Sequence, residues 1–172
     1  MTNYIIPGSG FPPSLSVAKS ISDIANYKNQ DLGLIHATTL HKLRTVTSFS
    51  QLRFHCHKAT VGRTVHIITA LNATGFAVVD YFTSLSKPVP LACGSFYMGH
   101  GDDSMMSKLC SAWGPGGIGK WNHEANVPKE EKMNAPFYVQ GLYHFYVETG
   151  RPECDDYEKP ISAGDFWKIY VR

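Results

Sequence analysis

The segment from Trp113 to Trp121, WGPGGIGKW, contains glycines and a lysine at the spacing of a nucleotide-binding P-loop. A working P-loop lies between a buried strand and a helix, and a Ser or Thr hydroxyl after its lysine holds Mg²⁺. Here Trp121 follows Lys120, and the residues after it lack helical periodicity. The sequence therefore argues against phosphate binding. It favours a glycine turn that brings the two tryptophans close together, with an exposed Trp121 that stacks on a ligand as the alternative.

Two histidines flank a cysteine in the segment HCH, where His55 and His57 project from the same face of a predicted strand. His66 lies on the next predicted strand, so three imidazoles could form an open zinc site. The chain has eight histidines and no HExxH motif, and a strand with solvent-facing histidines explains the same pattern. Zinc binding is therefore a hypothesis with a plain structural alternative.

Carboxylates gather in two places, Asp102 with Asp103 and Glu153 with Asp155 and Asp156. Carboxylate oxygens in loops are the ligands that Ca²⁺ prefers, so the four aspartates form two candidate calcium sites. Helix capping explains the first cluster equally well. A salt bridge to Arg151 or Lys159 explains the second.

The four cysteines, Cys56, Cys93, Cys110 and Cys154, are even in number and contain no Cys-x-x-Cys pair. This pattern favours two disulfides over a zinc ribbon or a redox site. Of the three connectivities we favour Cys93–Cys110 and Cys56–Cys154, each worth roughly 3–5 kcal/mol in the chain-entropy model. Four free thiols in a reducing compartment are the alternative. The sequon at Asn72 fits a secreted glycoprotein.

Composition limits the classes of protein that this chain can belong to. A chain of 172 residues with 43% hydrophobic content can bury about 70% of its unfolded surface, which is enough for one core. Sixteen basic and fourteen acidic residues leave a formal charge of +2, which disfavours nucleic acid as a partner. No segment approaches the roughly 20 apolar residues of a membrane span.

The first residues, MTNYIIPGSGFPP, lack the basic and apolar regions of a secretory signal. The chain is therefore expected to be either cytosolic or a mature secreted chain with a new Met1. The predicted disulfides favour secretion, because paired cysteines persist in oxidising compartments.

Alternating hydrophobicity predicts strands over residues 51–59, 63–71 and 164–172. The first two flank the turn residues Val61 and Gly62 and are expected to pair as a hairpin. The apolar faces are Leu52, Phe54 and Cys56 in the first strand and Trp167, Ile169 and Val171 in the last. The opposite faces are Arg53, His55 and His57 in the first strand, and Phe166, Lys168, Tyr170 and Arg172 in the last.

Residues 137–148 have the strongest strand pattern of the chain. Their core face is expected to be Phe137, Val139, Tyr143, Phe145 and Val147, and their wetter face Tyr138, Gln140, His144 and Tyr146. Residues 91–98 are a further predicted strand.

Helical spacing is found in three places, residues 14–29, 75–85 and 101–114. The second is expected to end at Pro88. The third is expected to be capped by Asp102 or Asp103 and closed by Gly114. We therefore predict an α+β fold, predominantly an antiparallel β-sheet of sandwich-like form, with two or three short helices. Residues 1–44 would form an extended N-terminal arm and short helix, and residues 45–172 a disulfide-linked β-rich domain.

These features favour a secreted, lectin-like binding module that recognises a glycan, an extracellular matrix or a protein surface through exposed aromatic rings. The expected ligand-binding residues are Trp113, Trp121, His123, Tyr138, His144 and Tyr146. Calcium is the cofactor that the aspartate clusters suggest. Strands flanked by cysteines and the acidic segment ECDDY resemble small extracellular adhesion and lectin-type domains in general terms, without a defining motif.

Two other classes of function fit the sequence. The first is a structural subunit that forms homo-oligomers by reaching across an interface with residues 1–13. The second is an enzyme with a histidine metal centre or an acid–base pair such as His123 with Glu124. The chain lacks the G-x-S-x-G pattern of a hydrolase nucleophile, so an enzyme is the less favoured class.

Overall fold

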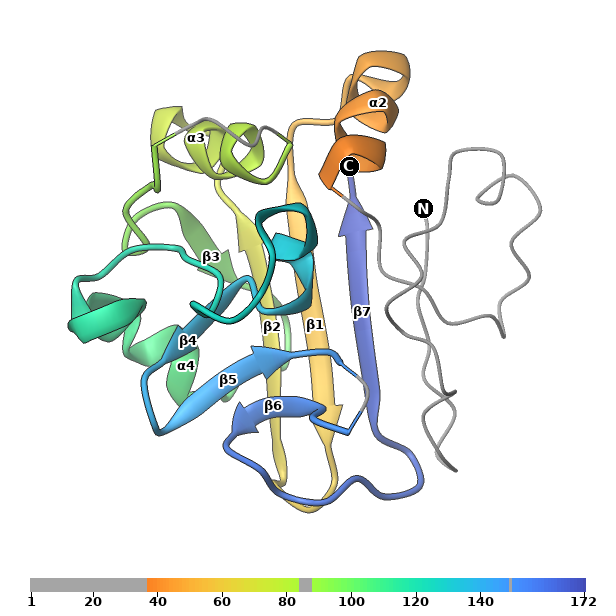
Figure 1. The fold of residues 1–172 in the computed structure, drawn as a ribbon, viewed down its shortest axis with the longest axis vertical. Coiled ribbons are helices and arrows are strands. Elements are labelled where there is room, and N and C mark those ends of the chain that lie inside the picture. Colours follow the sequence, from red (N-terminus) through yellow and green to blue (C-terminus); the bar gives the residue numbers. More distant parts are fainter. Residues whose placement is uncertain (1–36, 84–87, 149) are drawn as a thin grey trace.

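A computed structural model describes residues 37–83, 88–148 and 150–172, which contain two antiparallel sheets and three α-helices (Figure 1). The larger sheet has the strand order β3-β2-β1-β7, with β1 at Leu52–Lys58, β2 at Arg63–Thr69, β3 at Phe96–Met98 and β7 at Phe166–Val171. The smaller sheet has the order β4-β5-β6, with β4 at Phe137–Val139, β5 at Tyr143–Tyr146 and β6 at Glu153–Asp156. The predicted α+β fold dominated by antiparallel sheet is confirmed.

The helices are short and lie beside the sheets. They are α2 at Ala37–Thr47, α3 at Ala73–Phe82 and α4 at Met105–Lys108, with 3-10 turns η1 at Cys110–Ala112, η2 at Pro115–Gly117 and η3 at Lys129–Asn134. α2 crosses the predicted boundary between residues 44 and 45 and is bound to α3 by an ion pair of 2.5 Å between Arg44 and Asp80. The predicted helix over residues 14–29 and the N-terminal arm lie outside the described residues.

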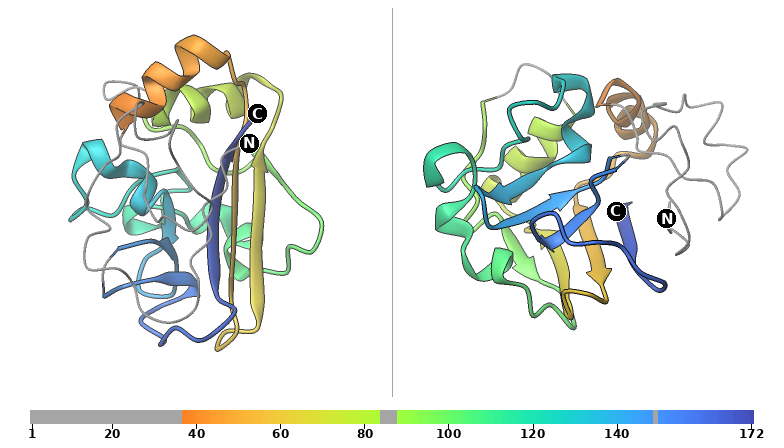
Figure 2. Two further views of the ribbon diagram at one scale, coloured as in Figure 1. Left: turned by 90° about the vertical axis from the view of Figure 1, so that its right-hand side faces the viewer. Right: turned by 60° about the horizontal axis from the view of Figure 1, so that its bottom comes forward.

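The predicted hairpin of β1 and β2 is confirmed, and β7 pairs with the other edge of β1. The alternation in β1 is regular, because Leu52, Phe54 and Cys56 are fully buried while the side chains that alternate with them are only half-buried. The small sheet and the helices lie on one side of this four-stranded sheet (Figure 2, left). The buried face of β1 therefore contacts the core, and its other face forms the outer surface of the sheet.

Residues 137–148 form two strands, not the single strand that their hydrophobicity predicts. The chain turns through Gly141, whose φ of +70° belongs to the left-handed region that glycine adopts without strain. The expected wet face is also wrong, because Tyr138, His144 and Tyr146 are all buried. Tyr146 packs with Val127 and Ala135, so the segment before β4 covers the face that was expected to meet water.

Two helix ends differ from the predictions. The helix predicted over residues 75–85 is confirmed, but it ends at the C-cap Thr83, whose amide donates to Val79 O, rather than at Pro88. The helix predicted over residues 101–114 has only one turn, with Ser104 rather than an aspartate as its N-cap.

Aromatic rings fill the space between the sheets. Trp113 and Trp121 meet edge to face at 4.9 Å, and Phe54 contacts Trp121 at 5.6 Å and Phe137 at 5.4 Å. The glycine turn therefore brings the tryptophans together, as predicted, and the alternative of an exposed Trp121 is wrong. Both predicted disulfides are formed, Cys93–Cys110 within a loop and Cys56–Cys154 between β1 and β6. The second disulfide joins the two sheets across the core.

Candidate functional site

The aromatic residues expected to bind a ligand are almost all inside the protein. Trp113 and Trp121 are 0% exposed, and their indole N–H groups donate to Met106 O at 2.8 Å and to Ser95 Oγ at 2.6 Å. Burial of large rings in an aromatic core stabilises the fold more than exposure would. The expectation that these rings, together with the buried residues Tyr138, His144 and Tyr146, are exposed for binding is therefore wrong.

His123 is the remaining member of that predicted set and is half-buried. Its Nδ1 lies 3.2 Å from the hydroxyl of Tyr81. Burial lowers the pKa of His123, and the nearby Lys132 and Lys129 lower it further. The ring is therefore neutral at pH 7. The structure does not bring it together with the other predicted binding residues at an open surface.

The first aspartate cluster organises backbone and hydroxyl groups. Asp102 accepts from the amide of His66 at 2.6 Å and from the hydroxyl of Ser107 at 2.6 Å. Asp103 accepts from the amide of Thr64 at 2.6 Å. Both carboxylates therefore tie the loop before α4 to the edge of β2.

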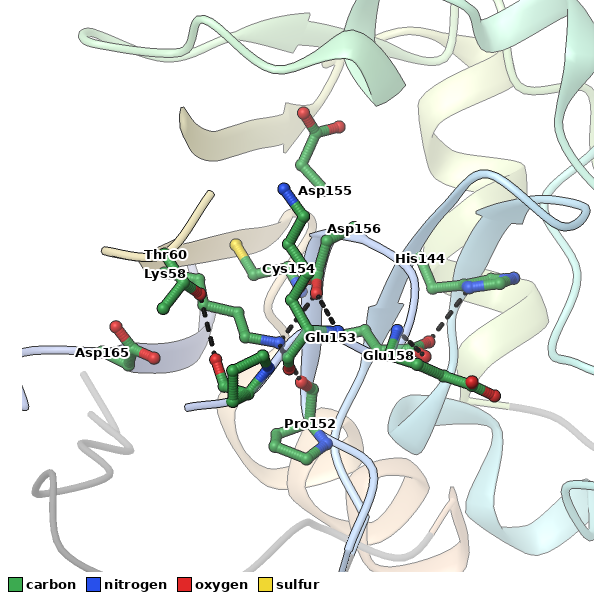
Figure 3. A network of polar contacts seen from close by, with 12 residues as sticks. Lys58, Thr60, His144, Pro152, Glu153, Cys154, Asp155, Asp156, Glu158 and Asp165 are labelled. Atoms are coloured by element: carbon green, nitrogen blue, oxygen red, sulfur yellow. Dashed lines mark hydrogen bonds and ion pairs between the residues drawn. The ribbon is translucent and has the colours of Figure 1, made fainter. Parts of the chain in front are cut away.

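The second cluster lies in β6, which the sequence analysis interpreted as a loop. Asp156 forms an ion pair of 2.7 Å with the fully buried Lys58, whose ammonium also donates to Pro152 O at 2.8 Å and to Lys159 O (Figure 3). Asp155 pairs with Arg63 and accepts from the amides of α4. These bonds use the carboxylates to join β6 to the β1–β2 hairpin.

Glu153 is the centre of a third buried group. Its carboxylate contacts His144 Nδ1 at 3.0 Å (Figure 3). It also contacts Arg151 Nε at 3.0 Å, and Arg151 pairs with Glu124 at 2.7 Å. Burial alone would raise the pKa of Glu153, but its contacts with His144 and Arg151 outweigh burial and hold that pKa below its ordinary value. The predicted salt bridge to Arg151 is thus confirmed for this cluster.

A cavity of about 650 Å³ lies beside this group and is lined by residues 150–153 and 158–161. Two of its charged side chains are already engaged, because Arg151 is bound by two glutamates and the amide of Glu158 donates to Glu153. Arg151 and Glu153 therefore have structural partners within the protein.

The strands of the larger sheet contain basic residues but no acidic ones, in contrast to the acidic strand β6. None of the strands β1, β2, β3 and β7 contains an Asp or Glu, whereas they contain four Lys or Arg residues and three histidines. Two of these cations, Lys58 and Arg63, pair with the aspartates of β6. Among the described residues, Arg53 and Lys168 make no ion pair. The outer face is therefore cationic.

Strand register places these groups side by side. His55 faces His66 on β2 and Lys168 on β7, and Arg53 faces Tyr170. The two imidazole rings stack at 4.4 Å, while the guanidinium of Arg53 lies 4.7 Å from the ring of Tyr170. The outer patch is defined here as the following residues on three neighbouring strands: Arg53, His55, His66, Phe166, Lys168 and Tyr170.

Three nitrogen atoms of the outer patch are buried without a hydrogen-bond partner. Within the described residues only four side-chain atoms have this property, and they include Arg53 Nε, His55 Nδ1 and His66 Nε2. The fourth, His144 Nδ1, lies 3.0 Å from a carboxylate oxygen of Glu153 and therefore has a polar neighbour. A buried polar atom without a partner costs about 1–3 kcal/mol. Three such atoms on one face lack partners that the described residues could have supplied.

The protonation of His66 follows from its neighbours. Its Nδ1 lies 2.7 Å from His100 O, and a carbonyl oxygen can only accept, so Nδ1 carries the proton. In the neutral ring Nε2 is therefore an acceptor. Gly99 permits this position, because a Cβ there would lie 2.5 Å from the ring of His66.

A protonated His55 would need a hydrogen-bond acceptor, whereas Nε2 of a neutral His66 needs a donor. Burial lowers the pKa of His55 to about 4, and repulsion from Arg53, from Lys168 and from any proton on His66 or His57 acts in the same direction. An anion on this face would oppose both effects. The outer patch thus presents two permanent cations together with the imidazole of His66 and that of His55, which an anion would help to protonate.

The histidines do not form the predicted zinc site. Across residues 37–83, 88–148 and 150–172 no three His, Cys, Asp or Glu side chains are grouped so that they could hold a metal ion. His57 is turned toward Thr64 Oγ1 at 3.0 Å. The two aspartate clusters likewise form no such group in this part of the chain, so neither predicted metal grouping is seen.

The sequon residue Asn72 is exposed but has a structural role. Its side-chain oxygen caps α3 by accepting from the amide of Gly75 at 2.8 Å, and its Nδ2 lies 3.3 Å from Gly94 O. Glycosylation of Asn72 stays a prediction.

The outer patch was missed by the sequence analysis although its parts were visible there. Alternation had already placed Arg53 with His55 on one solvent face, and Phe166 with Lys168 and Tyr170 on another. The pairing of β1 with β7 makes these two faces one surface.

Comparison with models of known protein families, with curated proteins and with solved structures found no match. In the described parts of the chain, no helix has the length and apolar character needed to cross a membrane. The fold and the outer patch therefore define the protein as an α+β module with two disulfides and a cationic sheet face.

Proposed function

We propose that the protein is a secreted binding module that recognises a glycan or an extracellular matrix surface through its outer patch. Three buried nitrogen atoms without partners on one sheet face carry this proposal. A ligand with hydroxyl and anionic groups could supply the missing hydrogen bonds. The predicted binding role is thus retained, but its location moves from the buried aromatics to the sheet.

The two disulfides support an oxidising, extracellular environment, because such bonds rarely persist in a reducing cytosol. The aromatic rings at the edge of the patch support a sugar ligand. Phe166 and Tyr170 are half-buried, and Lys168 and Arg53 lie over their rings at 4.6 Å and 4.7 Å. The patch therefore combines positive charge with apolar ring surface, a combination that suits a charged sugar.

The proposal is tested by applying the wild type and two variants of this protein to an array of glycans and matrix proteins. The wild type and the Lys129→Gln variant, which removes an exposed cation on η3, are expected to bind the same spots. The Arg53→Gln variant is expected to lose them, because Arg53 is the centre of the cationic face. A blank array for the wild type, or equal binding by Arg53→Gln, would contradict the proposal.

A further inference from the structure

The outer patch carries few charges, and this limits the kind of glycan that fits it. Within the outer patch only Arg53 and Lys168 carry permanent charge, and neither makes an ion pair with another described residue. The whole chain has a formal charge of +2. Polyanion binding requires many released counterions and therefore many cations. The patch matches one anionic group per binding site.

Resting on the proposed function, we infer that the outer patch binds a sugar with a single carboxylate, such as a uronic or a sialic acid. The planar guanidinium of Arg53 presents donors in the fork that a carboxylate accepts. Its Nε is one of the buried atoms without a partner. Lys168 lies opposite His55 on the neighbouring strand and adds the second positive charge.

His66 is the reason to infer a sugar ligand rather than a simple carboxylic acid. With Nδ1 bound to His100 O, its Nε2 is an acceptor that needs a donor. A sugar hydroxyl is such a donor, and a carboxylate is not. A ligand that carries both groups therefore satisfies Arg53 and His66 together, which neither a neutral sugar nor a simple anion would do.

The inference is tested by NMR titration with the methyl glycosides of glucuronic acid, sialic acid and glucose, with glucose 6-sulfate, and with an N-acetylated glutamate peptide. At least one carboxylate sugar is expected to bind tenfold or more tightly than methyl glucoside. The Arg53→Gln and Lys168→Gln variants are each expected to weaken that binding at least tenfold. The control Lys129→Gln should stay within twofold of the wild type. Circular dichroism and thermal midpoints verify that every variant is folded.

Other outcomes overturn the inference and separate it from the proposed function. Equal or tighter binding of methyl glucoside or glucose 6-sulfate, lost in Arg53→Gln, would overturn the carboxylate sugar but support a glycan-binding module. Equal binding of the glutamate peptide would replace the sugar by an acidic peptide. Failure of all five probes together with a blank array would overturn both the inference and the proposed function.

Discussion

His55 and His66 stack at 4.4 Å across β1 and β2, and each ring has one buried nitrogen without a hydrogen-bond partner. Two imidazoles so close together cannot both be charged without repulsion. Arg53, His57 and Lys168 add further positive charge around His55. The pair is therefore a point where acid should weaken the fold.

We expect the protein to lose stability as the pH falls from about 6.5 to about 4. The folded-state pKa of His55 is about 4, below its ordinary value of 6.5, so the unfolded chain binds more protons in that window and acid favours unfolding. Above pH 6.5 the contribution is constant. Thermal midpoints measured at each pH should fall less steeply in His55→Gln than in the wild type. His100→Gln, which replaces an exposed histidine, should follow the wild type, and a parallel slope for His55→Gln would contradict this assignment.

Removal of the Cys56–Cys154 disulfide should destabilise the protein more than removal of Cys93–Cys110. The first closes a loop of 98 residues and the second a loop of 17, and the loss of chain entropy in the unfolded state grows with loop length. We expect about 4–5 kcal/mol for the double alanine variant of the first pair and about 3 kcal/mol for the second. Guanidinium unfolding measures both. Four free thiols in protein from its natural source would contradict the oxidised state and the extracellular assignment together.

Lys58→Met should destabilise the protein by about 3–5 kcal/mol, because it leaves the buried carboxylate of Asp156 without its cation. The double variant Lys58→Met with Asp156→Asn should be less destabilised than the sum of the two single variants, since no buried charge is then left unpaired. Urea unfolding of the four proteins gives the coupling energy. Strict additivity would show that the ion pair has no stabilising role.

Gly99→Ala should displace His66 without removing any functional group. The added Cβ would lie 2.5 Å from the imidazole, so the ring or the backbone beside it must shift. We expect shifted imidazole resonances of His66 in NMR spectra and at least tenfold weaker binding of a carboxylate sugar. Unchanged His66 resonances would show that the ring does not depend on the small residue.

The sequence patterns correctly predicted those strands whose buried and exposed faces follow from their own alternation of apolar and polar residues. The strict alternation of residues 51–59 indicated both the strand β1 and its buried face, since successive side chains of a strand point in opposite directions. The four cysteines indicated two disulfides because their number, spacing and separation left few alternatives, and both favoured pairings are confirmed. The wrong predictions concern residues whose neighbours come from distant parts of the chain.

Tertiary structure alone decided which faces meet water and which polar groups come together. Tyr138, His144 and Tyr146 alternate like an exposed face, but other segments of the chain cover both sides of that hairpin. Arg53 and Lys168 are more than 100 residues apart in sequence, and only the register of β1 with β7 places them on one surface. Hydrophobic periodicity shows which side chains of a segment share one face. It does not report what lies on either side, because that depends on long-range packing.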